Sequence, residues 1–303
     1  MSGYFIVTPT KNEEDTLPDL IRSIEKQIIK PNLWVIVDES SDNTKEIIES
    51  LEKKYRWVKG IFLKKSDGYL GSNYGAACKC GFDFGLNYLD QHSIEYDYVG
   101  LIDADVTVEE SFFNKLIIKL ETNPSLGIAS GRDQFHNKGS ASSPWVGDFP
   151  IGPAKLWRKK CFFDTNGYQP VAAADSVSNI KAKLKGWEIR SFEDIPVTVR
   201  EHATAKGYWS GYIRLGRDSY FLNYNPILIA LKALRYSLKK PYYIGVAIFY
   251  GYLSSFIHEE KKIEDNEIKN YFMCIRPKEI LNYYIVELRS FCVRFFGDSS
   301  KNK

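Results

Sequence analysis

Two carboxylates follow a short apolar run in the middle of the chain. Residues 98–102 are aromatic and aliphatic, as in a buried β-strand, and Asp103 and Asp105 come directly after them. Because residues i and i+2 of a strand point to the same side, we expect the two carboxylates to converge at the edge of a sheet. Neighbouring anions repel unless a cation joins them, and hard divalent cations bind carboxylate oxygens. The pattern predicts a metal site, although an ordinary solvated turn also presents such a pair.

The sequence before this pair alternates between strand-like and helix-like segments. Strand-like runs occupy residues 4–8, 33–37 and 58–63, and the run before Asp103 is the fourth. Apolar residues at helical spacing separate them, and a helix rich in glycine and alanine is expected over residues 71–89. This alternation predicts an α/β fold, with an open, mostly parallel sheet flanked by helices.

Ligands of such sheets bind at the carboxyl ends of the strands. The first strand is expected to end at Thr8, because Pro9 follows it, and the second ends at Asp38. Asp67 follows the third strand, and the acidic pair follows the fourth. Each of these residues alone is common in turns, but together they predict a polar site along one edge of the sheet.

The length and composition describe a globular protein with no nucleic-acid partner. The chain has 303 residues and a formal net charge of +3, which is too small to indicate nucleic-acid binding. No charged leader with an apolar core opens the sequence, so we expect no signal peptide and a cytoplasmic protein. Five cysteines without zinc or redox spacing are expected to be reduced.

In their order, these segments resemble family 2 glycosyltransferases, which have the GT-A fold. Residues 7–13, Val-Thr-Pro-Thr-Lys-Asn-Glu, resemble the first strand of the family and its Pro-x-x-Asn-Glu turn. Residues 35–44 resemble its Val-Asp-Asp-Gly-Ser-x-Asp-Asn-Thr segment, from which Glu39 and Ser40 depart. The small-residue helix and the Asp-Ala-Asp segment at residues 103–105 follow in the order of the family.

The resemblance extends more loosely to residue 205 and implies a catalytic domain over residues 1–206. Asp175 keeps the position of the catalytic base of the family, whereas Ala174 replaces an acid that is usual beside it. His202 falls where related enzymes carry a metal-binding histidine.

The resemblance implies an inverting, metal-dependent hexosyltransferase that uses a nucleotide-diphosphate sugar. In this interpretation Asp105 binds the metal directly, and Asp103 faces the ribose or a metal-bound water. Asp175 removes the proton from the acceptor hydroxyl. The metal is Mn²⁺ or Mg²⁺, and an imidazole ligand from His202 favours Mn²⁺.

Recognition of the base and ribose is expected to involve Thr8 and Asp38, with Lys65 or Asp67 completing the pocket. Two alternatives remain open. A nucleotidyltransferase of related fold would show a glycine-rich loop after the first strand, and residues 8–12 lack those glycines. A noncatalytic nucleotide-sugar-binding protein would be expected to lack the acids, and these are present.

Residues 207–303 are expected to form a helical extension. An apolar, tyrosine-rich run over residues 241–257 follows several basic residues, and a last helix over residues 278–296 carries an apolar stripe. A run of this length is short for a bilayer span, and its basic flank is typical of a segment in the membrane interface. Packing on its own domain and a homodimer interface are the alternatives. The acceptor is expected to be a glycan or a lipid-linked molecule, at the inner face of the cell membrane if the interface hypothesis holds.

Overall fold

The chain folds into two compact units. The computed structural model describes residues 3–64, 70–133, 149–200, 209–238 and 240–296, with side chains described except at 70–73 and 287–296. The first unit contains residues 1–138 and 148–202, and the second contains residues 139–147 and 203–303. The boundary that we predicted at residue 206 lies outside the described residues and stays a prediction.

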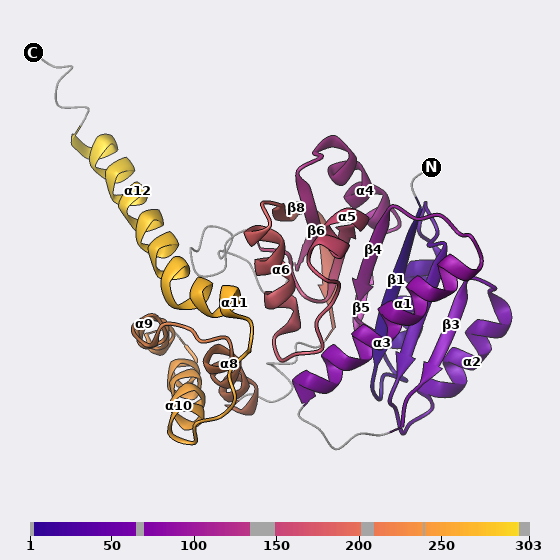
Figure 1. The fold of residues 1–303 in the computed structure, drawn as a ribbon, viewed down its shortest axis with the longest axis horizontal. Coiled ribbons are helices and arrows are strands. Elements are labelled where there is room, and N and C mark those ends of the chain that lie inside the picture. The colour runs from indigo at the N-terminus through magenta and orange to yellow at the C-terminus, as the bar shows by residue number, and fades with distance from the viewer. Residues whose placement is uncertain (1–2, 65–69, 134–148, 201–208, 239, 297–303) are drawn as a thin grey trace, which may run out of the picture. The chain divides into compact units, whose positions relative to one another are not determined.

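In its described part, the first unit is built on one eight-stranded sheet with helices on both faces (Figure 1). The strands are β1 (Tyr4–Thr10), β2 (Leu33–Asp38), β3 (Val58–Phe62), β4 (Tyr98–Ile102), β5 (Val106–Val108), β6 (Leu126–Asp133), β7 (Ala154–Arg158) and β8 (Glu188–Val199). Their order is β3-β2-β1-β4-β7-β6-β8-β5. Strands β3, β2, β1 and β4 are parallel, whereas β7 pairs antiparallel with β4 and β6, and β5 pairs antiparallel with β8. The predicted α/β fold with a mostly parallel sheet is confirmed.

Each face of this sheet buries its own apolar cluster. The helices are α1 (Leu17–Glu25), α2 (Thr44–Lys54), α3 (Leu70–Gln91), α4 (Phe112–Thr122), α5 (Lys159–Asp164) and α6 (Ala174–Leu184). Helices α1, α2 and α4 cover one face, and α3, α5 and α6 cover the other. Buried strand residues alternate between the two clusters, as the period of a strand requires: Tyr4 and Ile6 face the first, and Phe5 and Val7 face the second.

Strand β1 is longer than predicted. It continues through Pro9 to Thr10, where Thr10 pairs with Asp38 of β2. The prediction that the strand stops at Thr8 is therefore wrong. Proline is tolerated because the pairing of β1 with β4 ends at Val7, so the missing N–H of Pro9 removes no hydrogen bond from that ladder.

The glycines of α3 allow this helix to lie directly on the sheet. A Cβ at Gly81 would lie 2.5 Å from Val7 Cγ1 and 2.8 Å from Val37 Cγ2, and one at Gly85 would lie 2.7 Å from the ring of Phe5. The side chains of Val7, Val37 and Phe5 are fully buried and closely packed, so they could not move aside for an added Cβ. The small-residue pattern of the sequence therefore reflects close packing of helix on sheet.

In its described part, the second unit is helical, as predicted. Its elements are α8 (Trp209–Phe221), α9 (Pro226–Ser237), α10 (Tyr243–Ile257), α11 (Asn266–Asn270), the π-helical turn η1 (Tyr271–Ile275) and α12 (Arg276–Phe296). Helix α10 packs against both α8 and α9. Across the described ranges, every helix is too short or too polar to cross a bilayer.

Replacing Gly81 by valine is expected to lower the free energy of unfolding by about 1–3 kcal/mol, because the added atoms overpack the contact with β1 and β2. Ala76→Val is the control, since Ala76 is exposed on the same helix and the substituted residue is equally β-branched. Urea unfolding measures both variants. A Gly81→Val protein as stable as the Ala76→Val protein would contradict the close packing of α3.

Candidate active site

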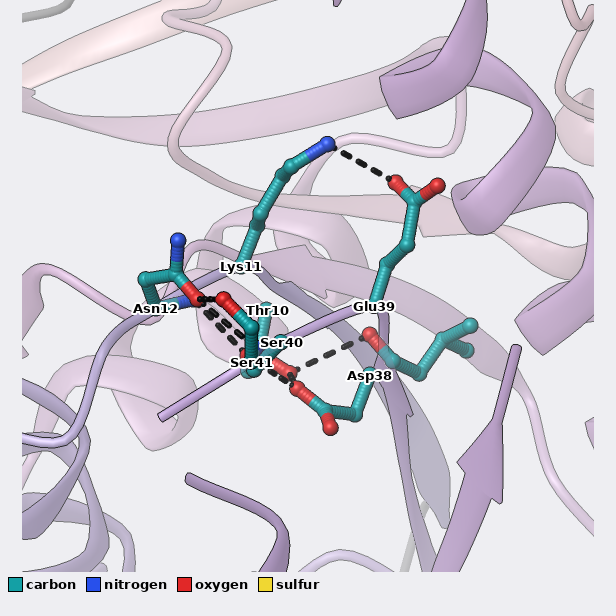
Figure 2. Close-up of polar contacts among 8 residues, drawn as sticks. Thr10, Lys11, Asn12, Asp38, Glu39, Ser40 and Ser41 are labelled. Carbon is teal, nitrogen blue, oxygen red and sulfur yellow. Dashed lines mark hydrogen bonds and ion pairs between the residues drawn. The ribbon is translucent and has the colours of Figure 1, made fainter. Parts of the chain in front are cut away.

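The loops after β1 and β2 are joined at the carboxyl end of the sheet (Figure 2). Asp38 is buried, and its Oδ1 accepts hydrogen bonds from the hydroxyl of Thr10, at 2.8 Å, and from that of Ser40. The carboxylate is thus held in one orientation by two donors. Among the described residues its second oxygen, Oδ2, has no hydrogen-bond partner, so it remains able to accept from a ligand.

The two residues that depart from the family pattern take part in this junction. The side chain of Glu39 pairs with Lys11, with 3.2 Å between Nζ and Oε2. The hydroxyl of Ser40 accepts the backbone N–H of Asn12 at 2.7 Å, and the side-chain Oδ1 of Asn12 accepts the backbone N–H of Ser41 at 2.8 Å. Figure 2 shows these contacts bridging the two loops. The departures therefore contribute to the structure of the strand ends.

Thr8 lies two residues before the true end of β1. Its side chain is fully buried, and its hydroxyl accepts the indole N–H of Trp34 at 2.9 Å. This contact belongs to the core, so burial disfavours the predicted nucleotide contact of Thr8. The hydroxyl that reaches the edge of the sheet beside Asp38 is that of Thr10.

Asp103 and Asp105 lie in a tight turn between β4 and β5. The backbone N–H of Val106 donates to the carbonyl of Asp103 at 3.2 Å, so strand alternation ends before the pair and does not orient it as we predicted. The Asp103 carboxylate accepts a hydrogen bond from the hydroxyl of Tyr74, on α3, at 2.7 Å. Helix α3 thus positions one of the two carboxylates.

The negative charges of the site influence one another. Burial raises the pKa of Asp103 well above its usual range, and the charges of Asp105 and Asp175 raise it further. The hydrogen bond from Tyr74 and the charge of Lys155 act in the opposite direction. The structure therefore brings together the three acids that were predicted from widely separated parts of the sequence.

A buried lysine orients Asp175. Lys155, on β7, is fully buried, and its Nζ lies 2.6 Å from Oδ1 of Asp175, whose side chain is 31% exposed. The hydroxyl of Tyr168 donates to the same oxygen at 3.1 Å. Both described partners use Oδ1, so among the described residues Oδ2 is left without a partner. Asp175 has the geometry of a fixed carboxylate with one oxygen available.

The backbone next to Asp175 is built around the carboxylate. A Cβ at Gly152 would lie 2.6 Å from Oδ2 of Asp175, so a larger residue there would displace the carboxylate.

Ala174 is buried in the apolar cluster beneath α6, which explains why an acid is absent at this position. Ala173 precedes the helix with a φ of 53°, a left-handed conformation that costs a residue with a Cβ about 1–2 kcal/mol.

The donor chemistry of the site fits a divalent cation. Asp103 and Asp105 offer carboxylate oxygens. Burial is the main cause of the raised pKa of Asp103, and the charges of Asp105 and Asp175, which add to it, are ones that a cation would offset. Across the described ranges, no three His, Cys, Asp or Glu side chains are placed to hold a metal by themselves. His202 lies outside the described residues, but the N–H of Arg200 donates to the carbonyl of Asp105 at 2.9 Å. Lys65 and Asp67 also lie outside them, so their predicted roles stay predictions.

Sequence reasoning missed Lys155, Tyr74 and Thr10. Lys155 sits inside a strand, and only the pairing of β7 with β4, which puts it opposite Leu101, brings its amine to the acids. Tyr74 lies in a helix for which the family pattern specifies only small residues, so the pattern gave no reason to select a tyrosine there. A strand predicted to continue through Pro9 would have ended at Thr10 and identified its hydroxyl as a candidate.

A comparison with protein families matches residues 5–167 to the description "Glycosyl transferase family 2". This match spans more than half of the chain and includes the joined loops and the acidic turn. The chain belongs to glycosyl transferase family 2. The family that was predicted from the motifs is confirmed, and with it the enzyme class, glycosyltransferase.

Curated proteins similar to this family 2 chain include two polysaccharide-forming enzymes. The poly-beta-1,6-N-acetyl-D-glucosamine synthase of Staphylococcus aureus strain MSSA476 is 29% identical over 143 residues, which cover 46% of this chain and 31% of that protein. Glucomannan 4-beta-mannosyltransferase 7 of Arabidopsis thaliana is 23% identical over 218 residues, 62% of this chain and 37% of that protein. The chain thus spans about a third of the length of these relatives.

Solved structures of similar fold include two glycosyltransferases. The mannosyltransferase PcManGT from Pyrobaculum calidifontis, in complex with GDP-Man and Mn²⁺, matches with a TM-score of 0.55 at 14% identity, over 94% of this chain and 86% of that one. S. aureus TarS 1-349 in complex with UDP-GlcNAc matches with a TM-score of 0.50 at 18% identity, over 93% and 79%. At these identities the likeness establishes the fold, which is of the GT-A type.

Lys155→Met is expected to lower the free energy of unfolding by about 3 kcal/mol, because it leaves Asp175 close to two other carboxylates without its counter-charge. Adding Asp175→Asn should recover part of this loss, because it removes the uncompensated charge. Lys79→Met, which breaks an exposed ion pair with Asp83, is the control and should change stability by no more than about 1 kcal/mol.

Urea unfolding of the wild type, the two single variants at positions 155 and 175, and their double variant completes a double-mutant cycle. A coupling energy indistinguishable from zero would contradict the ion pair between Lys155 and Asp175.

Proposed function

We propose that this chain is an inverting glycosyltransferase that moves a hexose from a nucleotide-diphosphate sugar to an acceptor hydroxyl. The observation that carries the proposal is the grouping of Asp103, Asp105 and Asp175 at the carboxyl end of the sheet. Asp103 and Asp105 lie within the residues that match family 2, and Asp175 follows them in the chain. Two of these acids suit the donor side of the reaction, and the third suits the acceptor side.

Asp175 is the proposed base. Lys155 and Tyr168 both contact Oδ1, which leaves Oδ2 to accept the proton of the acceptor hydroxyl as its oxygen attacks the anomeric carbon. The sugar–phosphate bond breaks on the opposite side of the sugar, so the anomeric configuration inverts in one step. No residue of the protein forms a bond to the sugar in this mechanism.

The donor phosphates would be bound with Mn²⁺ or Mg²⁺, which offsets the negative charge of the leaving diphosphate. Asp105 is the proposed direct ligand, and His202 is the proposed second ligand because Arg200, two residues before it, is bonded to the Asp105 backbone. Asp103, held by Tyr74, would face the ribose or a metal-bound water.

The joined loops are the proposed site for the nucleoside. Asp38 Oδ2 would accept from the ring imide or from the ribose hydroxyls, with Thr10 and Ser40 holding the carboxylate in place. We transfer the role predicted for Thr8 to Thr10, because the hydroxyl of Thr8 is already used by Trp34. Lys65 or Asp67 would complete the pocket.

The relatives guide the choice of donors and acceptors to test. Their names point to N-acetylglucosamine and mannose as sugars, and the structural neighbours are described with UDP-GlcNAc and GDP-Man. A growing glycan or a lipid-linked sugar is the proposed acceptor, and the cytoplasm is the proposed compartment. A nucleotidyltransferase would instead release pyrophosphate from a nucleoside triphosphate. A noncatalytic binding protein would bind the nucleotide sugar and release no product.

Thermal unfolding with UDP-, GDP- and dTDP-sugars, each with and without Mn²⁺, is the first test of the donor site. We expect one nucleotide to raise the melting temperature, and more strongly when the metal is present, since ligand binding stabilises the folded state. The absence of a shift with every nucleotide, in both conditions, would contradict the donor site.

With the donor identified, Asp105→Ala should weaken its metal-dependent binding by at least about tenfold, because a direct ligand is lost. Asp175→Asn should leave donor binding unchanged and reduce transfer by about 10²–10⁴-fold, the usual contribution of a general base. Asp83→Asn, at an exposed site on α3, is the control. Wild-type transfer by the Asp175→Asn protein would remove Asp175 from the role of base.

A further inference from the structure

Helix α10 contains no charged residue along its fifteen residues, Tyr243–Ile257. A helix that is apolar all round is normally buried on all sides. One side of α10 is buried: a Cβ at Gly251 would lie 2.1 Å from the carbonyl of Ile213 on α8, and one at Gly245 would lie 1.9 Å from the carbonyl of Ala233 on α9. The glycines therefore bring α10 into direct backbone contact with both neighbours.

The opposite side of α10 is exposed within the described structure. The exposed fractions are 56% for Val246, 41% for Phe249, 54% for Tyr250, 41% for Leu253 and 66% for Ile257. The spacing of three, four and seven residues places these side chains on one stripe of the helix. This stripe consists of aliphatic and aromatic residues.

Helix α9 carries a second stripe of the same kind. Ile227, Leu231, Leu234 and Leu238 recur at intervals of four, three and four residues, with exposed fractions of 71%, 52%, 59% and 73%. The buried residues of this helix, Leu228, Ile229 and Ala233, lie on a different side. The two stripes together hold nine exposed large apolar residues, whereas monomeric soluble proteins usually expose apolar residues singly.

The charges on these helices have one sign. From residue 226 to residue 257 the sequence contains four basic residues and no acidic residue. Lys240 is exposed between the helices, and the guanidinium of Arg235 donates to the hydroxyl of Tyr284 at 3.1 Å. Lys232 is partly buried, and its burial and the charge of Arg276 lower its pKa to about 8, so we assign it no role at the surface.

We propose that α9 and α10 lie in the interface of a membrane that contains anionic lipids, with their apolar stripes among the acyl chains. The apolar stripes match the boundary of the hydrocarbon region, and a segment with basic but no acidic residues matches anionic headgroups. Helix α10 is about 22 Å long at 1.5 Å per residue, shorter than the hydrocarbon core of about 30 Å, so it lies along the surface. This inference does not depend on the proposed transferase activity.

The direct test is sedimentation of the full chain with vesicles of phosphatidylcholine, with and without phosphatidylglycerol. We expect binding to the anionic vesicles that weakens as salt is raised. Val246→Asp combined with Leu253→Asp should weaken this binding at least tenfold, because two carboxylates would have to enter the acyl region. Lys240→Ala should weaken it about fivefold, the equivalent of about 1 kcal/mol per basic residue.

Ile118→Asp is the matched control, because Ile118 is a single apolar residue with an exposed fraction of 50% on α4 of the other unit. It should bind vesicles as the wild type does. Thermal unfolding of each variant in the absence of vesicles verifies that the proteins are folded; all four substituted positions are exposed, so their melting temperatures should stay close to that of the wild type.

Absence of binding to anionic vesicles at low salt would overturn the proposal. Equal binding by the wild type and the Val246→Asp/Leu253→Asp protein would overturn it as well. Sedimentation equilibrium without vesicles distinguishes the main alternative. A wild-type dimer that the double variant dissociates, without vesicle binding, would make this face an interface between two copies of the chain.

Discussion

Repulsion among carboxylates at the carboxyl end of the sheet is the constraint around which the first unit is arranged. Asp103, Asp105 and Asp175 come from two different segments, and the charges of the last two disfavour ionisation of the first. The fold offsets this repulsion with one fully buried cation, Lys155, which contacts Asp175 at 2.6 Å. Carboxylate oxygens that meet in this way are suited to a metal ion with the phosphates of a nucleotide sugar.

The carboxylates of Asp38 and Asp175, both at this edge of the sheet, are oriented by different sets of donors. Asp38 is held by hydroxyl donors from the loops after β1 and β2, where the ion pair of Lys11 and Glu39 joins the loops. Asp175 is held by groups that reach it through the sheet and through the loop after α5. Each carboxylate keeps one oxygen without a described partner. The site is therefore oriented before a ligand binds, which lowers the entropic cost of binding.

The fold, and the position of several candidate site residues at the ends of strands, could be predicted because they follow from local patterns. The alternation of strands and helices identified the sheet. Asp38 is the last residue of an otherwise apolar strand, and Asp103 and Asp105 follow another apolar strand. The end of β1 was predicted wrongly for a physical reason. Proline usually ends a strand, but Pro9 lies where β1 no longer pairs with β4, so its missing N–H costs no hydrogen bond on that side. Lys155 could not be predicted, since its role comes from the register of β7 against β4 rather than from its neighbours in sequence.

Asp175, the proposed base, would act from the side of the sugar opposite to the leaving diphosphate. Proton NMR of the enzyme turning over its nucleotide sugar, with water or a simple alcohol as acceptor, observes the anomeric configuration of the first product directly. A donor with an α-linked sugar should give the β anomer before mutarotation. Early accumulation of the α anomer would contradict the single-step mechanism and the role that it assigns to Asp175.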